Sequence, residues 1–176
     1  LTSVTEQWAV AAICGPNSRE LLAELCPDID LSDEAFPFMG YKEGTVAGIK
    51  ARIFRISFTG ELSFEINVPR SYGVSLWTAL LETGKKYDIC PYGTEAMHVL
   101  RAEKGFIIVG QETDGTVTPV DLGMDWIISK TKSDFIGKRA LARRDIVKND
   151  RKQLVGLLIN NKTDILPEGS QIVEDE

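Results

Sequence analysis

Histidine, cysteine and long apolar runs are scarce in this 176-residue sequence, which has one histidine and three cysteines. The cysteines form no Cys-x-x-Cys pair, so a structural zinc site and a disulfide framework are both excluded, and we expect no metal site. Unpaired cysteines are typical of a reducing compartment, and we therefore expect a cytoplasmic protein. No apolar run approaches the roughly 18 residues that a membrane-spanning helix needs, so no membrane partner is expected.

Two further classes are disfavoured by what the chain lacks. Acidic residues outnumber basic ones by 26 to 20, and the resulting net charge of −6 does not suit a nucleic-acid partner, whose phosphates attract clustered lysine and arginine. The phosphate-binding patterns Gly-x-Gly-x-x-Gly and Gly-x-x-x-x-Gly-Lys-Ser/Thr are missing, so nucleotide-triphosphate chemistry is not expected. The sequence opens at Leu1 rather than methionine, and we expect a fragment of a longer protein.

Apolar periodicity predicts an α+β fold for the first half of the chain. A strand and a helix capped by Asn17 come first and are followed by a loop. One long or two short strands then lead through a turn into a further strand, which is followed by a second helix and a short closing strand. The expected bounds are 8–14, 18–25, 28–41, 46–58, 62–68, 69–84 and 87–90. This βαββαβ order is that of the ferredoxin-like motif, which we expect over residues 1–92. Three positions of the second helix are predicted to face the core, Trp77, Leu80 and Leu81.

The remainder of the chain is expected to add helices and then to enter a second domain. Residues 93–147 read as a helical and strand continuation, and residues 148–176 as the start of a truncated C-terminal β-barrel. The expected elements are helices over 93–104 and 136–147 and β segments over 119–130, 154–159 and 172–173. Because a strand pair without a completing sheet is unstable, the chain is expected to stop inside a β-rich domain.

Glu65 is the most informative polar residue of the predicted strands. Leu62, Phe64, Ile66 and Val68 alternate with it, so Glu65 shares the opposite face with the other polar side chains of its strand. One interpretation is that Glu65 is only the polar half of an alternating strand. The other is a binding role, because a carboxylate on a rigid strand beside aromatic residues can accept two parallel N–H donors from a flat heterocycle.

His98 is the only histidine, and any histidine-dependent catalysis would have to use it. On the predicted helix it lies three residues from both Glu95 and Arg101, on one stripe with them. A partly buried histidine paired with Glu95 is one interpretation of this spacing. A catalytic base is the other.

Four separated segments carry a resemblance to a known family. They read RISFTGELSFE at 55–65, PYGTEAMHVLRAEKG at 91–105, GQETDGTVTPVDLGM at 110–124 and DFIGKR at 134–139. In this order they resemble the folate-binding aminomethyltransferase-type domain, and in particular its version at the C-terminal end of the alpha subunit of heterotetrameric sarcosine oxidase. Met97 and His98 stand where the glycine-cleavage members have a charged pair, which favours the oxidase branch.

The resemblance implies a tetrahydrofolate site in which Glu65 binds the pterin ring, Arg101 belongs to the folate cleft and Phe58 lies nearby. It implies no catalytic residue within this chain, because the family's folate-proximal aspartate belongs to a segment before the first strand. The parent enzyme would oxidise sarcosine at a flavin, with FAD, FMN and NAD elsewhere in the complex and other subunits as partners. The one-carbon unit would leave as 5,10-methylenetetrahydrofolate.

Two alternatives stay open beside this interpretation. One is an aminomethyltransferase of the glycine-cleavage type, which would act on a carrier-bound aminomethyl group. The other is a non-catalytic interaction module that has lost its folate affinity. In each case the chain alone is expected to be inactive.

Overall fold

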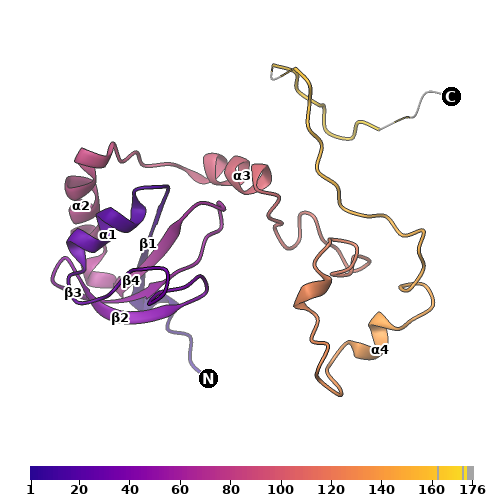
Figure 1. Ribbon diagram of the computed structural model, residues 1–176, viewed down its shortest axis with the longest axis horizontal. Coiled ribbons are helices and arrows are strands. Elements are labelled where there is room, and N and C mark those ends of the chain that lie inside the picture. Colours follow the sequence, from indigo (N-terminus) through magenta and orange to yellow (C-terminus); the bar gives the residue numbers. More distant parts are fainter. Residues whose placement is uncertain (162, 172, 174–176) are drawn as a thin grey trace. The chain divides into compact units, whose positions relative to one another are not determined.

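An antiparallel four-stranded sheet forms the centre of the first part of the chain (Figure 1). The computed structural model describes residues 1–161, 163–171 and 173, and the chain divides into two units, residues 1–107 and 108–176. The strands are β1 (Trp8–Cys14), β2 (Tyr41–Val46), β3 (Ile49–Phe54) and β4 (Ser63–Pro69), in the spatial order β1-β4-β3-β2. β1 and β2 therefore form the two edges of this sheet.

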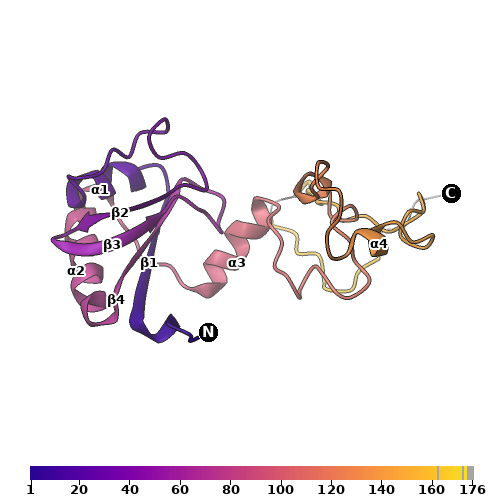
Figure 2. The same ribbon diagram turned by 90° about the horizontal axis from the view of Figure 1, so that it is seen from below.

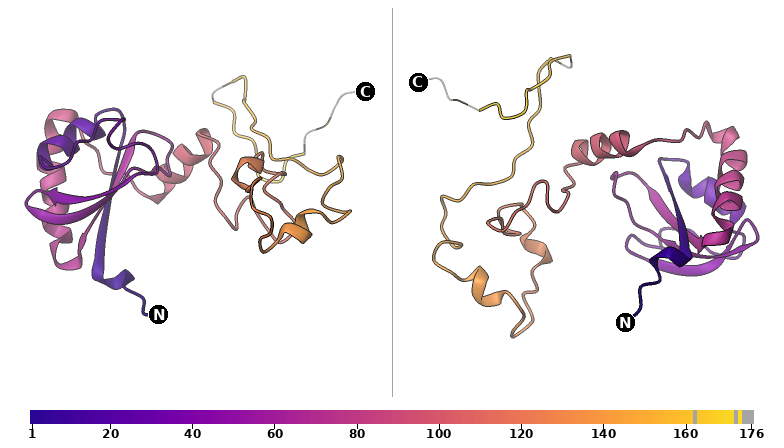
Figure 3. Two further views of the ribbon diagram at one scale, coloured as in Figure 1. Left: turned by 60° about the horizontal axis from the view of Figure 1, so that its bottom comes forward. Right: turned by 180° about the vertical axis from the view of Figure 1, so that it is seen from behind.

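Two helices cover one face of the sheet, as Figures 2 and 3 show. They are α1 (Ser18–Leu25) and α2 (Gly73–Gly84), and they pack against each other and against the strands. The core between them is closed by fully buried side chains from both layers, among them Leu22, Ile53, Phe64, Ile66, Val68 and Leu76. Burying each such side chain stabilises the fold by roughly 1.5–3 kcal/mol. The alternation of apolar and polar residues in β4 therefore determines which face of this strand packs against the helices. The α+β class is thus confirmed.

A β-hairpin occupies the region for which the sequence predicts a loop followed by one long or two short strands. Tyr41 begins β2 rather than ending a loop, and β3 begins at Ile49 rather than at residue 46. The hairpin turn lies at Ala47 and Gly48, both of which have positive φ angles. Two such residues form the tight turn whose twist matches that of antiparallel strands. Ala47 is an unusual residue there, and its presence hid the turn from sequence inspection.

The predicted closing strand at 87–90 does not form, and that prediction is wrong. Gly84 does not end α2 in a left-handed conformation; the helix continues into a 3-10 turn at Lys85–Tyr87, and Asp88 is the left-handed residue, with φ 55°. This bend turns the backbone out of strand geometry, and Pro91 lacks the N–H that a ladder would need. The side-chain cap expected from Asn17 is also not formed.

The expected helix near residue 93 is present as α3 (Thr94–Glu103). The second unit, residues 108–176, is different from the expectation. Its regular elements, within the described residues, are a 3-10 turn at Asp125–Ile127 and the single-turn helix α4 (Lys138–Leu141). No strand is assigned over 119–130 or 154–159, so the barrel start is not confirmed, and Ile172 of the last expected β segment lies outside the described residues. Strands need hydrogen-bonded neighbours, and none are available to these segments in the described structure.

Candidate functional site

Glu65 lies in the middle of β4, on the face of the sheet opposite to α1 and α2. Its Cα partners are Ala12 of β1 and Phe54 of β3, so the carboxylate is held between two neighbouring strands. The side chain is half-buried. A central strand paired on both sides is the most rigid support that a small sheet offers, and it fixes the direction of the carboxylate.

Aromatic and cationic side chains surround Glu65 on this second face. Phe54 is half-buried, and its ring lies 5.0 Å from that of Tyr41, centroid to centroid. Toward the other end of the strands, the Arg52 guanidinium stacks 4.3 Å above the Trp8 ring and lies 3.4 Å from the Glu43 carboxylate. The face therefore combines flat apolar surfaces with a fixed carboxylate, which suits a planar ligand that carries N–H donors.

The connection between β3 and β4 holds the second predicted site residue, Phe58, which is 38% exposed. Thr59 beside it is buried, and the Gly60 N–H donates to the Ser57 hydroxyl at 2.8 Å, which closes a tight turn. The next residue, Glu61, has a buried Oε2 that accepts no hydrogen bond from the residues the structure describes. A buried carboxylate oxygen without a donor is costly, so Glu61 is a candidate acceptor for a ligand.

The third predicted site residue, Arg101, is 5% exposed on α3. Its Nη1 donates to the Phe106 carbonyl at 3.0 Å, across the C-terminal end of the helix. Lys104, three residues further along the same face, packs directly against Gly60 of the turn. The structure thus brings the Arg101 face of α3 toward the turn that precedes β4.

A cavity of about 590 Å³ lies beside β1. It is bordered by β1, by α2 and by the segment between α2 and α3, which includes Tyr92. At its rim the Cys14 thiol donates to the Tyr92 phenol oxygen at 3.4 Å. Burial, Cys14, Glu61 and Glu65 together raise the pKa of Tyr92, so its phenol stays protonated.

Comparison with known families decides what kind of domain this is. Residues 1–132, which include the whole sheet, the β3–β4 turn and α3, match the family described as the GCVT N-terminal domain. The chain belongs to this family.

Relatives of this GCVT-family chain include sarcosine oxidase alpha subunits, mitochondrial dimethylglycine dehydrogenases and aminomethyltransferases. The sarcosine oxidase subunit alpha of Corynebacterium sp. (strain U-96) is 54% identical over 173 residues, and that of Rhizobium meliloti (strain 1021) is 45% identical over 175 residues. The alignments cover 98% of this chain and 18% of each relative. The aminomethyltransferase of Thermoanaerobacter sp. (strain X514) is 36% identical over 145 residues, which are 82% of this chain and 39% of the relative. The chain therefore spans less than half the length of these relatives.

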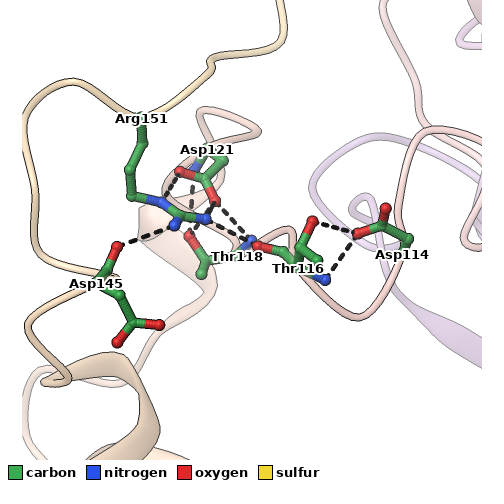
Figure 4. Close-up of polar contacts among 6 residues, drawn as sticks. All are labelled: Asp114, Thr116, Thr118, Asp121, Asp145 and Arg151. Carbon is green, nitrogen blue, oxygen red and sulfur yellow. Dashed lines mark hydrogen bonds and ion pairs between the residues drawn. The ribbon is translucent and has the colours of Figure 1, made fainter.

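The second unit of this GCVT-family chain contains an ion pair whose polar atoms are densely hydrogen-bonded (Figure 4). Arg151 donates to both Asp121 oxygens, at 2.8 and 2.6 Å, and also to the backbone carbonyls of Thr116 and Asp145. The Thr118 backbone N–H and hydroxyl donate to Asp121 as well. Arg151 is the first cause of the lowered pKa of Asp121. These hydrogen bonds connect three loop segments and occupy most of the polar atoms of the pair, so few remain to bind a ligand. We therefore assign the pair a structural role.

One predicted core position of the first unit is wrong. Trp77 is 49% exposed, and Leu76 takes its place among the buried side chains of α2. Leu80 is buried as predicted, and Leu81 is half-buried. His98 is half-buried, but within the described residues its side chain forms no hydrogen bond or ion pair with Glu95.

Further absences hold for the part of the chain that the structure describes. No group of three or more histidine, cysteine, aspartate or glutamate side chains there is arranged to hold a metal ion. None of its helices has the length and apolarity to cross a membrane.

Sequence reasoning missed three residues of this region, namely Phe54, Glu61 and Tyr92. Phe54 was detectable, since the alternation of its strand places it on the polar face with Arg52. Glu61 could not be identified, because nothing in a turn sequence reveals a buried oxygen without a donor. Tyr92 could not be placed, since its contact with Cys14 joins positions 78 residues apart.

Proposed function

We propose that this chain is the folate-binding part of a sarcosine oxidase alpha subunit. In this role it holds tetrahydrofolate as the acceptor of the one-carbon unit that oxidative demethylation of sarcosine releases. The similarity to two such subunits over nearly the whole chain supports the proposal. The observation that carries it is the position of Glu65, a half-buried carboxylate on the central strand β4 with Phe54 beside it.

The residues present fit a reduced folate. The pterin edge offers an amino group and a ring N–H side by side, and the two Glu65 oxygens can accept both in a fork. Phe54, the strand partner of Glu65, and Phe58, on the turn before β4, supply flat apolar surface, and the Oε2 of Glu61 remains available for a further N–H donor. Arg101, buried on α3, would line the folate cleft on the side of the β3–β4 turn.

The chain's own contribution is binding and orientation. When bound, tetrahydrofolate supplies N5 and N10, the two nitrogens that take up the one-carbon unit as 5,10-methylenetetrahydrofolate. Glu65 fixes the ring at one end, so the acceptor nitrogens are held in place rather than free in solution. Holding an acceptor in this way raises its effective concentration around a reactive electrophile. Residues outside this chain would carry out the oxidation.

The proposal extends to the complete protein. It would be a cytoplasmic heterotetramer in which FAD, FMN and NAD bind elsewhere, and the other subunits would be the partners of this domain. An aminomethyltransferase function is the second candidate. It has weaker support, because the similarity to an aminomethyltransferase is lower and covers less of the chain.

Calorimetric titration of tetrahydrofolate into the full-length protein tests the proposal. Each charge-assisted bond to Glu65 contributes roughly 1.5–3 kcal/mol, so Glu65→Ala should weaken binding at least about tenfold. Glu65→Gln should give an intermediate affinity. The amide keeps one acceptor oxygen, but its NH2 group is a donor that faces an N–H donor of the pterin. Sarcosine oxidation should persist in both variants, with free formaldehyde replacing the folate adduct.

Asn67→Ala is the matched control, since Asn67 lies on the same strand and the same face, two residues from Glu65. It should leave the affinity unchanged. Unaltered tetrahydrofolate affinity in a folded Glu65→Ala protein would contradict the proposed site. Absence of folate binding in the unmodified protein would instead favour the non-catalytic module.

A further inference from the structure

Tyr92 is the polar side chain near Glu65 that the proposed function does not yet use. It lies on the segment between α2 and α3 and borders the cavity beside β1. Tyr92 is 40% exposed, and its oxygen accepts the Cys14 thiol hydrogen at 3.4 Å. The contact fixes the phenol at the C-terminal end of the edge strand β1.

Strand register shows on which face that phenol lies. Cys14 is opposite Ser63, and Ala12 is opposite Glu65, so Cys14 and Glu65 belong to the same alternating face of the sheet. The core residue Ile13 points to the other face, toward α1 and α2. Tyr92 therefore reaches over the edge of the sheet onto the face that carries the Glu65 carboxylate.

The hydrogen bonding of Tyr92 is incomplete in one specific respect. A phenol has one donor hydrogen and an oxygen that can accept. The Cys14 thiol uses the oxygen as an acceptor, which leaves the O–H free to donate to a partner. Burial raises the pKa of Tyr92 most, and the negative neighbours Glu61 and Glu65 add to the effect, so the donor hydrogen is retained at neutral pH.

A donor at this place complements the remaining polar group on the pterin edge. That edge presents the 2-amino group, the N3–H and the 4-oxo oxygen in a row, which is a donor, a donor and an acceptor. The Glu65 carboxylate matches the first two groups but cannot match the third. A neutral O–H beside Glu65 supplies the missing donor.

We propose that Tyr92 is a specificity-determining residue that donates its phenol O–H to the 4-oxo oxygen of a pterin held by Glu65. The inference rests on the proposed folate function and adds the chemical class of ring that the site selects. A 4-oxo pterin satisfies both Glu65 and Tyr92. A 4-amino pterin places a donor against the Tyr92 donor and is disfavoured.

The test compares two ligands, tetrahydrofolate and its 4-amino analogue, by calorimetric titration into the full-length protein. Tyr92→Phe keeps the ring and its packing but removes the O–H. A lost neutral hydrogen bond weakens binding by about fivefold to tenfold, so tetrahydrofolate affinity should fall by that factor. Affinity for the 4-amino analogue should not fall, and the preference for the 4-oxo ligand should shrink accordingly. The ratio of the two affinities isolates the interaction from any general effect on the site.

Tyr72→Phe is the control, because Tyr72 is also a tyrosine of the first unit, 48% exposed, on the 3-10 turn Arg70–Tyr72. It should change neither affinity. If Tyr92→Phe lowers the affinity for both ligands equally, Tyr92 acts only through packing or through Glu65. Any result in which the ratio of the two affinities stays unchanged overturns the inference. If the unmodified protein binds neither ligand, the proposed function itself fails, which is a separate and recognisable result.

Discussion

Gly60 and Lys104 lie in direct contact, so that a Cβ atom on Gly60 would stand 2.2 Å from the Lys104 Cγ. Gly60 also has a φ angle of 89°, which side chains other than glycine rarely adopt. This contact joins the turn before β4 to the C-terminal end of α3. It therefore helps to hold the Phe58 turn beside the Arg101 helix.

Gly60→Ala should destabilise the first unit through both strain and overlap. Gly48 is a matched control, since its φ angle is 77° and an added Cβ would meet nothing within 4 Å. Gly48→Ala should cost about 1–2 kcal/mol for the left-handed backbone alone. Gly60→Ala should cost about 1–3 kcal/mol more, because overpacking is added.

Urea denaturation of the full-length protein measures this difference. Lys104→Ala removes the overlapping Cγ and should recover part of the additional loss in the Gly60→Ala background. Equal destabilisation by the two glycine variants would show that the contact between Gly60 and Lys104 is not maintained in solution.

Trp77→Ala should have only a small effect on stability. Because Trp77 is 49% exposed, its truncation should lower the free energy of unfolding by less than about 1 kcal/mol. Leu76→Ala, one residue earlier and 1% exposed, should lower it by about 2–5 kcal/mol. Thermal melting of both variants provides the comparison. A larger loss of unfolding free energy for Trp77→Ala than for Leu76→Ala would show that Trp77, not Leu76, faces the core.

The pair formed by Asp121 and Arg151 should make the second unit sensitive to acid. Arg151 lowers the pKa of Asp121 in the folded state, so the stabilisation is complete above the ordinary aspartate value of about 4. It is lost as the pH falls below that value and through the lowered folded-state pKa. Cleavage of residues 108–176 by pepsin should therefore accelerate progressively below about pH 4.

Asp121→Asn should remove most of that pH dependence and increase cleavage at neutral pH by a non-specific protease. Asp145→Asn is the control, because the hydrogen bond from Arg151 goes to the Asp145 backbone carbonyl. The hydrogen bond with Asp121 is the first of the causes that raise the pKa of Arg151, and the Asp145 carboxylate is only the last. A variant with Asn at position 121 that resists proteolysis as well as the unmodified protein would show that the pair contributes nothing to this unit.

The three cysteines should react with iodoacetamide in the order of their exposure. Cys90 is exposed, Cys14 is intermediate and Cys26 is buried. Burial, followed by its hydrogen bond with Asp28, raises the pKa of the Cys26 thiol to about 12, so little thiolate is present at pH 8. Peptide mass spectrometry of the native protein should find Cys90 alkylated first and Cys26 only after denaturation. Equal labelling of Cys26 and Cys90 in the native protein would contradict the buried position.

Local pattern was sufficient to determine much of the first unit. The alternation of residues 62–68 correctly placed Glu65 opposite to Phe64 and Ile66, because each strand residue points to the face opposite to its neighbour. The helical spacing of residues 18–25 predicted α1 at its observed bounds. These features depend on neighbours a few residues away, and such neighbours are visible in the sequence.

Only the tertiary structure decided the features that depend on distant partners. The segment near Asp88 bends away from strand geometry and brings Tyr92 onto Cys14 instead of forming the predicted closing strand at 87–90. The orientation of Trp77 depended on which helix face meets the sheet, a choice between adjacent apolar residues that periodicity leaves nearly equal. The described residues of the second unit carry apolar segments without strand partners, because a strand forms only where another backbone supplies its hydrogen bonds.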